Sequence, residues 1–303
     1  MKLTEKNYFT KDNKYLSNSK ITSFLRDTET FEKLYIKYTE VFETTPSIEV
    51  GKAVDIYLTD SADAFKKLYT KAVLKKDDPE LFEENKTTDK TVLTKATYDK
   101  VMTMAKYVKR TKAYKELKEY KTQEILSMDI KKHKRFKGLC GIPDFFEIKG
   151  DTCTIVDLKT SNVITDKKYF YHCIDYGYFS QLAMYSILIM NKYPKVRKFN
   201  YRHLVVENVK PYRTRTFHLD GNIVKAAVNQ VMVIADYINA AKTFKRPDTT
   251  WENATLITYP DYGNNNIEQN KGVKSESKPE AKDKKVPKSG EPNTPNDGKK
   301  GKL

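Results

Sequence analysis

Cysteine is scarce in this sequence, and no stretch of it stays apolar for long. The three cysteines, Cys140, Cys153 and Cys173, form no close pair, which argues against a disulfide scaffold and a four-cysteine iron–sulfur cluster and favours places in the core. The longest apolar run, residues 182–190, is interrupted by Ser186 and is too short to cross a bilayer, which predicts a buried helix. The polar N-terminus lacks the apolar core of a signal peptide. These absences predict a cytoplasmic protein with no membrane partner.

Acidic residues are outnumbered by basic ones. The 303 residues include 56 lysines and arginines against 40 aspartates and glutamates, which gives a formal net charge of +16 at pH 7. Such an excess suits a polyanionic partner, most commonly nucleic acid. The alternative is that the charge serves solubility and is inflated by a basic tail.

Aromatic residues are absent from residue 264 to residue 303, where Lys, Glu, Pro, Asn, Gly and Ser dominate. A segment of this composition cannot bury enough apolar surface to order itself. We therefore expect a folded domain over residues 1–262 and a disordered, Lys-rich tail over residues 263–303. The tail either adds nonspecific DNA affinity, carries a docking segment or only solubilises the protein.

Hydrophobic periodicity predicts both helices and strands ahead of the tail. Helices are expected from Ser17 or Ser19 to about residue 37, and over residues 47–58, 96–117, 169 or 174 to 192, and 223–244 with Asp220 as the cap. Strands are expected over residues 121–132, 198–207 and 214–219.

Two further apolar-rich runs, residues 139–148 and 153–158, flank the turn Lys149-Gly150-Asp151 and predict a β-hairpin. Asp144 lies in the first run. Asp157 and Lys159 lie two residues apart at the end of the second, so both project from the same face of a strand. A hairpin could therefore bring two carboxylates and one ammonium group to the same edge of a sheet.

This combination of side chains suits metal-dependent chemistry on phosphate. Paired carboxylates bind a hard divalent cation such as Mg2+, and a neighbouring lysine can orient a water molecule or stabilise developing charge. Taken by spacing alone, an Asp-x-Lys sequence on a strand is more often a solvated face.

Three segments together resemble the PD-(D/E)XK nuclease superfamily. They are Gly-Ile-Pro-Asp at residues 141–144, Ile-Val-Asp-Leu-Lys-Thr at 155–160, and Gln-Leu-Ala-Met-Tyr at 181–185. The likeness spans residues 15–219 and is nearest to phage-type exonucleases of the RecE (exodeoxyribonuclease VIII) kind. It implies an α/β fold with a restriction-endonuclease-like core, in which helices flank a central mixed β-sheet.

The resemblance also implies roles for individual residues. The catalytic set would be Asp144, Asp157, Lys159 and Gln181, and Mg2+ or Mn2+ would be held by Asp144, Asp157 and the carbonyl of Leu158. Tyr185, four residues after Gln181 and so one helical turn away, would contact the lysine or the DNA backbone.

One position departs from the family pattern. Relatives carry Gly-x-x-x-His where this chain has Gly51 followed by Asp55. Aspartate is also a metal ligand, so Asp55 would complete the metal site; the alternative is a surface residue on a core helix. Upstream, Glu124 is a further acidic candidate.

Candidate DNA contacts come from two basic segments. Lys20 and Arg26 lie on the first long helix, where a solvated basic face is the commoner explanation, and Lys134 and Arg135 lie in a basic turn before Gly138.

The resemblance predicts a magnesium-dependent DNA exonuclease that digests linear duplexes from their ends in the 5′ to 3′ direction. It would leave 3′ single strands for a RecT-like annealing protein and would form a homo-oligomeric ring. The alternatives are a RecB- or Cas4-like nuclease acting on single strands or flaps, and a noncatalytic DNA-binding module on a decayed nuclease fold.

Overall fold

The computed structural model describes residues 3–244 of the chain. A five-stranded sheet with the strand order β10-β9-β8-β7-β4 forms the centre of this part. Its strands are β4 (Lys121–Thr122), β7 (Phe145–Lys149), β8 (Thr152–Ser161), β9 (Lys198–Glu207) and β10 (Thr214–Leu219). β8 and β9 run parallel, and every other neighbouring pair runs antiparallel. The predicted central mixed sheet is therefore confirmed.

Two smaller sheets accompany it. One has the order β1-β6-β5 and consists of Tyr15–Leu16, Gly138–Gly141 and Leu126–Asp129 for β1, β6 and β5. The other pairs β2 (Tyr69–Lys71) with β3 (Thr91–Leu93) in parallel. None of β1, β2 and β3 was expected, because runs this short carry little periodicity.

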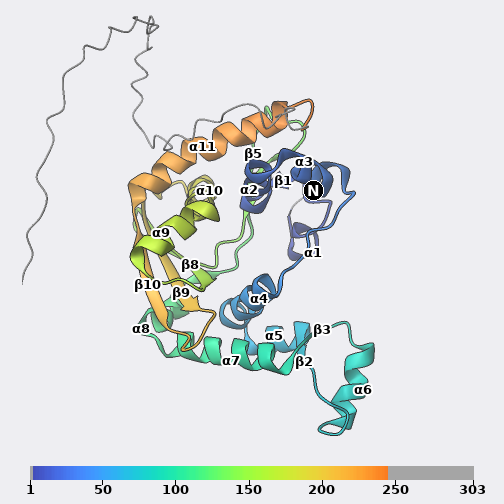
Figure 1. Ribbon diagram of the computed structural model, residues 1–303. Helices are drawn as coiled ribbons and strands as arrows, with labels where there is room; N and C mark the ends of the chain where they lie inside the picture. Colours follow the sequence, from blue (N-terminus) through green and yellow to red (C-terminus); the bar gives the residue numbers. More distant parts are fainter. Residues whose placement is uncertain (1–2, 245–303) are drawn as a thin grey trace, which may run out of the picture. The chain divides into compact units, whose positions relative to one another are not determined.

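Helices cover both faces of the central sheet (Figure 1). Helices that contribute side chains to the two core clusters include α2 (Asn18–Arg26), α4 (Pro46–Thr59), α7 (Lys95–Arg110), α10 (Tyr178–Lys192) and α11 (Gly221–Ala240). The remaining helices in this part of the chain are α1 (Glu5–Tyr8), α3 (Thr28–Glu32), η1 (Lys33–Lys37), α5 (Ala62–Leu68), α6 (Pro79–Thr87), α8 (Lys112–Lys115), η2 (Glu116–Glu119) and α9 (Asp166–Asp175).

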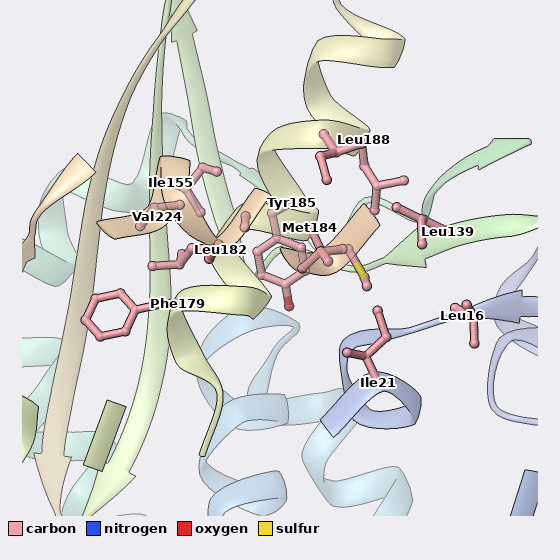
Figure 2. Close-up of a cluster of buried hydrophobic side chains, with 14 of the residues drawn as sticks. Leu16, Ile21, Leu139, Ile155, Phe179, Leu182, Met184, Tyr185, Leu188 and Val224 are labelled. Carbon is pink, nitrogen blue, oxygen red and sulfur yellow. The ribbon is translucent and has the colours of Figure 1, made fainter. Parts of the chain in front are cut away.

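The alternation of side chains along the strands divides the core into two layers. Ile155, Tyr201 and Val205 face a cluster that includes residues of α2, α10 and α11. Leu204 and Val206 face the opposite way, into a cluster with α4 and α7. Figure 2 shows the first layer, in which Leu182 and Leu188 of α10 lie between β8 and β6. The inner strands β8 and β9 are thereby covered on both faces over most of their length.

The hairpin turn is confirmed, but its first strand is not continuous. Residues 139–148 form β6 and β7, which belong to different sheets, with Ile142, Pro143 and Asp144 between them. Proline has no N–H to donate to a ladder, which favours a break at this point. The expected strand over 121–132 is similarly divided into β4 and β5 near Gln123, which has a left-handed φ of 48°.

Three expected helices are also interrupted, each at a residue suited to capping. Asp27 is extended and its side chain accepts from the N–H of Glu29, which separates α2 from α3. Thr111 caps α8 in the same way, and Gly177, with φ of 65°, separates α9 from α10. In each case the local hydrogen bond or the positive φ of the capping position outweighs the hydrophobic period.

Other expectations hold. β9 and β10 have the predicted bounds, and the Asp220 side chain caps α11 by accepting from the N–H of Asn222 at 2.8 Å. All three cysteines are buried and free. Within residues 3–244, no helix has the length and apolar character needed to span a membrane. The predicted tail and the boundary at residue 262 lie outside the described residues.

Candidate active site

The end of β8 brings the motif residues together. The last pair between β7 and β8 joins Phe145 to Val156, so beyond it the edge of β8 is open, and Asp144 occupies this opening. Oδ2 of Asp144 accepts a hydrogen bond from the Leu158 N–H at 2.7 Å. Because the N–H and C=O of a strand residue point to the same side, the Leu158 carbonyl also faces the side of Asp144.

Lys159 is held from three directions. Its ammonium forms an ion pair with Oδ2 of Asp157 and donates to Oε1 of Gln181 at 3.0 Å. It also lies over the ring of Tyr178, 4.7 Å from the centroid. The other end of the Gln181 amide donates to the hydroxyl of Tyr185 at 2.8 Å. The expected contact between the Gln-x-x-x-Tyr helix and the lysine is thus made by Gln181, with Tyr185 behind it.

Tyr185 is a buried support for this arrangement, because only 6% of it is exposed. A Cβ at Gly141 would lie 2.9 Å from its ring, so the glycine of the Gly-Ile-Pro-Asp segment leaves the space that the tyrosine fills. Two motifs that are far apart in the sequence therefore pack directly against each other.

Asp55 approaches from the opposite wall, on α4. A Cβ at Gly51 would lie 3.1 Å from Oγ1 of Thr160, so this glycine lets α4 come close to β8. Asp55 lines a cavity of about 430 Å³ together with Asp144, Leu158 and other residues, among them Lys159, Gln181 and Lys52. Its Oδ1 atom is buried and has no hydrogen-bond partner among residues 3–244. Asp55 is therefore half-buried, with one carboxylate oxygen wholly buried, and it lines the same cavity as Asp144.

Burial raises the pKa of all three carboxyl groups. The pKa of Asp55 rises to about 7, because the neighbouring charge of Asp157 adds to the effect of burial. The pKa of Asp144 rises well above its usual range for the same reasons, with Asp55 and Asp157 both contributing. Burial also raises the pKa of Asp157, although the ammonium of Lys159 partly opposes it. Ionisation of each of the three carboxyl groups is therefore less favourable in the folded protein than in water.

Lys159 shows the opposite balance. Burial disfavours its charged form, but the carboxylates of Asp157 and Asp144 outweigh that effect and raise the pKa of Lys159. The lysine is therefore an ammonium at neutral pH, and it is one positive charge facing three carboxyl groups.

These residues fit a hard divalent cation. No three His, Cys, Asp or Glu side chains in the described part of the chain already converge as a ready-made cluster. However, Oδ1 of Asp55 and Oδ1 of Asp157 are both buried without a hydrogen-bond partner in residues 3–244. Oxygen atoms of this kind, together with a backbone carbonyl, are the ligands that Mg2+ and Mn2+ take in proteins. A bound cation would offset the charge that raises these pKa values.

The first basic segment is partly turned inward. Nζ of Lys20 donates to the backbone carbonyls of Asn13 and Tyr15 at 2.9 and 2.8 Å, and burial lowers its pKa to about 8. Arg26 is exposed and reaches the carbonyl of Asp175 at 3.4 Å. Lys20 therefore ties the N-terminal segment to α2, whereas Arg26 stays accessible.

The second basic segment lies at α11. Arg135 donates to the carbonyl of Ile238 at 2.8 Å, so its guanidinium holds the turn to that helix, while Lys134 is exposed. Glu124 forms an ion pair with Lys192 and does not line the cavity of Asp55 and Asp144. Among residues 3–244, the acidic side chains that line this cavity are Asp55 and Asp144, while Asp157 is fully buried and paired with Lys159.

Sequence reasoning missed His203. It is fully buried on β9, directly beside Asp157 in the strand register, and Nδ1 bonds the Tyr169 hydroxyl at 2.8 Å. Burial lowers its pKa well below the usual range, so it is neutral. The available signal was its inward position in the strand, between Tyr201 and Val205.

Comparisons with known proteins agree with this fold. A crystal structure of a Eubacterium rectale protein, provisionally described as an exonuclease, matches with a TM-score of 0.57 and 22% identity over 79% of this chain and 87% of that one. The structure of SSO0001 matches 70% of this chain and 86% of that chain at 16% identity, but its TM-score of 0.26 is too low to indicate a shared fold. No curated protein matches the chain. The profile of the PDDEXK-like domain of unknown function matches residues 17–257, and the chain therefore belongs to this family of the PD-(D/E)XK superfamily.

Proposed function

We propose that the protein is a Mg2+- or Mn2+-dependent DNA exonuclease that hydrolyses phosphodiester bonds at the ends of linear duplexes. The observation that carries this proposal is the position of Lys159. Its ammonium is fixed between Asp157 and Gln181 at a cavity that Asp144 and Asp55 also line. A noncatalytic module has no need for a lysine held in this way beside Asp144 and Asp55, of which Asp55 keeps a buried oxygen without a hydrogen-bond partner among residues 3–244.

Each residue has a specific task in this proposal. Asp144, Asp157 and the Leu158 carbonyl would hold the metal, and Asp55 would complete the set. When bound, such an ion lowers the pKa of water and offsets charge on the phosphate. The N–H of Leu158 orients the Asp144 carboxylate by its hydrogen bond to Oδ2.

Lys159 would act by its charge. Because its pKa is raised, it does not serve as a proton acceptor near neutral pH. It instead donates hydrogen bonds to the attacking water or to a phosphate oxygen, and it stabilises the negative charge that grows in the transition state. Gln181 limits the directions in which the ammonium can point, and Tyr185 fixes Gln181.

The finer parts of the proposal rest on the resemblance to RecE-type exonucleases. They are the 5′ to 3′ direction, the 3′ single-stranded product, the RecT-like annealing partner, the role in recombination, the homo-oligomeric ring and a cytoplasmic location. The basic excess of the chain supports DNA as the substrate.

The test compares a linear duplex with a closed circle of the same sequence, with Mg2+, with Mn2+ and with a chelator. We expect the linear duplex to be shortened only with metal, and the circle to stay intact. Labels on the 5′ or 3′ ends report the direction, and blunt duplex, single strand and flap substrates separate the RecE-like from the RecB- or Cas4-like activity. If Asp157→Asn degrades linear duplex at the wild-type rate, the assignment of the site is wrong.

A further inference from the structure

A second groove, of about 570 Å³, adjoins the candidate active site. It shares Asp55, Asp144 and Ser19 with the cavity described above. Its outer walls come from the N-terminal segment around Phe9 and from the segment that follows η1, around Phe42. The groove therefore leads from the surface to the carboxylates of the site.

The outer walls expose large apolar side chains. The exposed fractions are 85% for Phe9, 40% for Tyr38, 87% for Val41 and 56% for Phe42. Exposed apolar groups gathered in one groove mark a binding surface more often than scattered ones do. Here three of them are aromatic rings, and each ring can stack on a flat partner.

The walls are fixed to the rest of the fold by hydrogen bonds. Tyr38, which has a left-handed φ of 55° at the end of η1, donates from its hydroxyl to the carbonyl of Lys11 at 3.2 Å. Lys20, through the two carbonyls that it binds, holds the same N-terminal segment against α2. The rings of Phe9, Tyr38 and Phe42 thus lie on two segments that are hydrogen-bonded to each other.

We propose that this groove, defined by Phe9, Tyr38 and Phe42, holds unpaired nucleotides of the DNA strand being cut, with their bases stacked on the rings. The inference rests on the proposed function, because it places the strand's phosphate at Asp144 and Asp55. Continuity with those carboxylates favours nucleic acid over a protein segment. Base faces are available to side chains only when the strand is unpaired, and stacking on aromatic rings is independent of sequence.

The two hollows that meet at Asp55 and Asp144 then have different tasks. The cavity with Lys52 and Lys159 receives the phosphate to be cut. The aromatic groove selects for a strand that has left its duplex, so that a frayed or single-stranded end is the form of DNA that enters the site.

The experiment measures binding without chemistry. Fluorescence anisotropy in a chelator compares a labelled oligothymidylate with an abasic oligonucleotide of the same length. We expect the wild-type protein to bind the oligothymidylate about ten-fold more tightly or better, because a stacked base contributes that much. Phe9→Ala and Phe42→Ala should each lose about ten-fold for the oligothymidylate and little for the abasic strand.

Matched variants separate stacking from other effects. Phe42→Tyr keeps a ring and should keep the affinity, whereas Phe42→Leu keeps only apolar volume and should lose it. Tyr107→Ala removes an exposed aromatic side chain from α7, outside the groove, and should bind as the wild type does. Phe9 and Phe42 are exposed, so thermal melting should show each variant folded.

Several results would overturn the groove proposal. Equal affinity of the wild type for the two oligonucleotides would do so, as would unchanged binding by the alanine variants. Unchanged binding with an altered sedimentation coefficient would assign the rings to contacts between copies of the chain. The two proposals can fail separately. A wild-type protein that shows the base-dependent binding but never shortens linear DNA with Mg2+ refutes the proposed nuclease activity, while the binding of unpaired nucleotides in the groove still stands.

Discussion

The two helices that flank the candidate active site differ in how far their polar side chains are satisfied. On α10, the amide of Gln181 is hydrogen-bonded at both ends, to Lys159 and to Tyr185. On α4, the buried Oδ1 of Asp55 has no partner among residues 3–244. The polar side chain on α10 is thus satisfied by protein groups alone, whereas the one on α4 leaves a buried oxygen to which a cation could bind.

This difference separates positioning from binding. A satisfied buried network is rigid and specifies one geometry, so the α10 side sets the direction of the ammonium of Lys159 before substrate arrives. A buried carboxylate without a partner is costly, and a cation that binds it recovers that cost.

The largest expected loss of activity comes from removing the ammonium group of Lys159, which lies between the side chains of α10 and α4. Lys159→Ala should lower kcat by about 10²–10³-fold, as loss of a transition-state hydrogen-bond donor typically does. Lys149→Ala, which removes an exposed lysine at the hairpin turn, is the matched control and should leave kcat unchanged. Steady-state cleavage of end-labelled duplex measures both, and a Lys159→Ala enzyme within a few-fold of wild type contradicts the proposal.

Asp55→Asn tests the α4 side. We expect affinity for Mg2+ to fall by about ten-fold or more, because a neutral amide replaces a charged oxygen ligand. In a chelator above pH 7 the same variant should melt at a higher temperature than the wild type, since it no longer buries a charge without a partner. Calorimetric titration with Mg2+ and thermal melting measure the two effects. If metal affinity is unchanged, Asp55 is not a ligand.

The raised pKa of Asp55 predicts how stability depends on pH when metal is absent. Its pKa is about 7 in the folded protein and about 3.9 in an unfolded chain, so the folded state binds the proton more tightly. Stability from this group is therefore present at low pH and is lost as the pH rises from about 4 through 7. Melting temperatures in a chelator should show this loss, and Mg2+ or Asp55→Asn should reduce it. Because the pKa of Asp144 is raised as well, some slope should remain in Asp55→Asn, but a slope of undiminished size would assign it to groups other than Asp55.

The smallest effect is expected on the α10 side. Tyr185→Phe removes only the hydroxyl that accepts from Gln181, which costs about 1 kcal/mol and lowers kcat by at most about five-fold. The ring still fills the space beside Gly141. Melting and kcat measure the two changes. A loss as large as that of Lys159→Ala would mean that Tyr185 contacts the substrate directly, against its burial.

Much of the fold was accessible from short-range patterns. The turn at Gly150, the bounds of β9 and β10 and the cap of α11 depend on neighbours within a few residues, and each prediction holds. The predicted bounds were wrong where a capping residue, a proline or a glycine interrupts a segment whose hydrophobic pattern continues. Pro143, Asp27 and Gly177 each divide an element that periodicity alone would continue.

The sequence by itself determined which residues can carry the chemistry. Asp157 and Lys159 lie two residues apart on a strand and so share a face, and the resemblance to PD-(D/E)XK nucleases singled out Asp144 and Gln181 as their partners. Only the tertiary structure decided their state. It left Oδ1 of Asp55 buried without a hydrogen-bond partner in the described part of the chain, placed the ring of Tyr185 in the space beside Gly141, and turned Lys20 inward. The physical reason is that desolvation and packing depend on atoms brought together from distant parts of the chain, which no local pattern specifies.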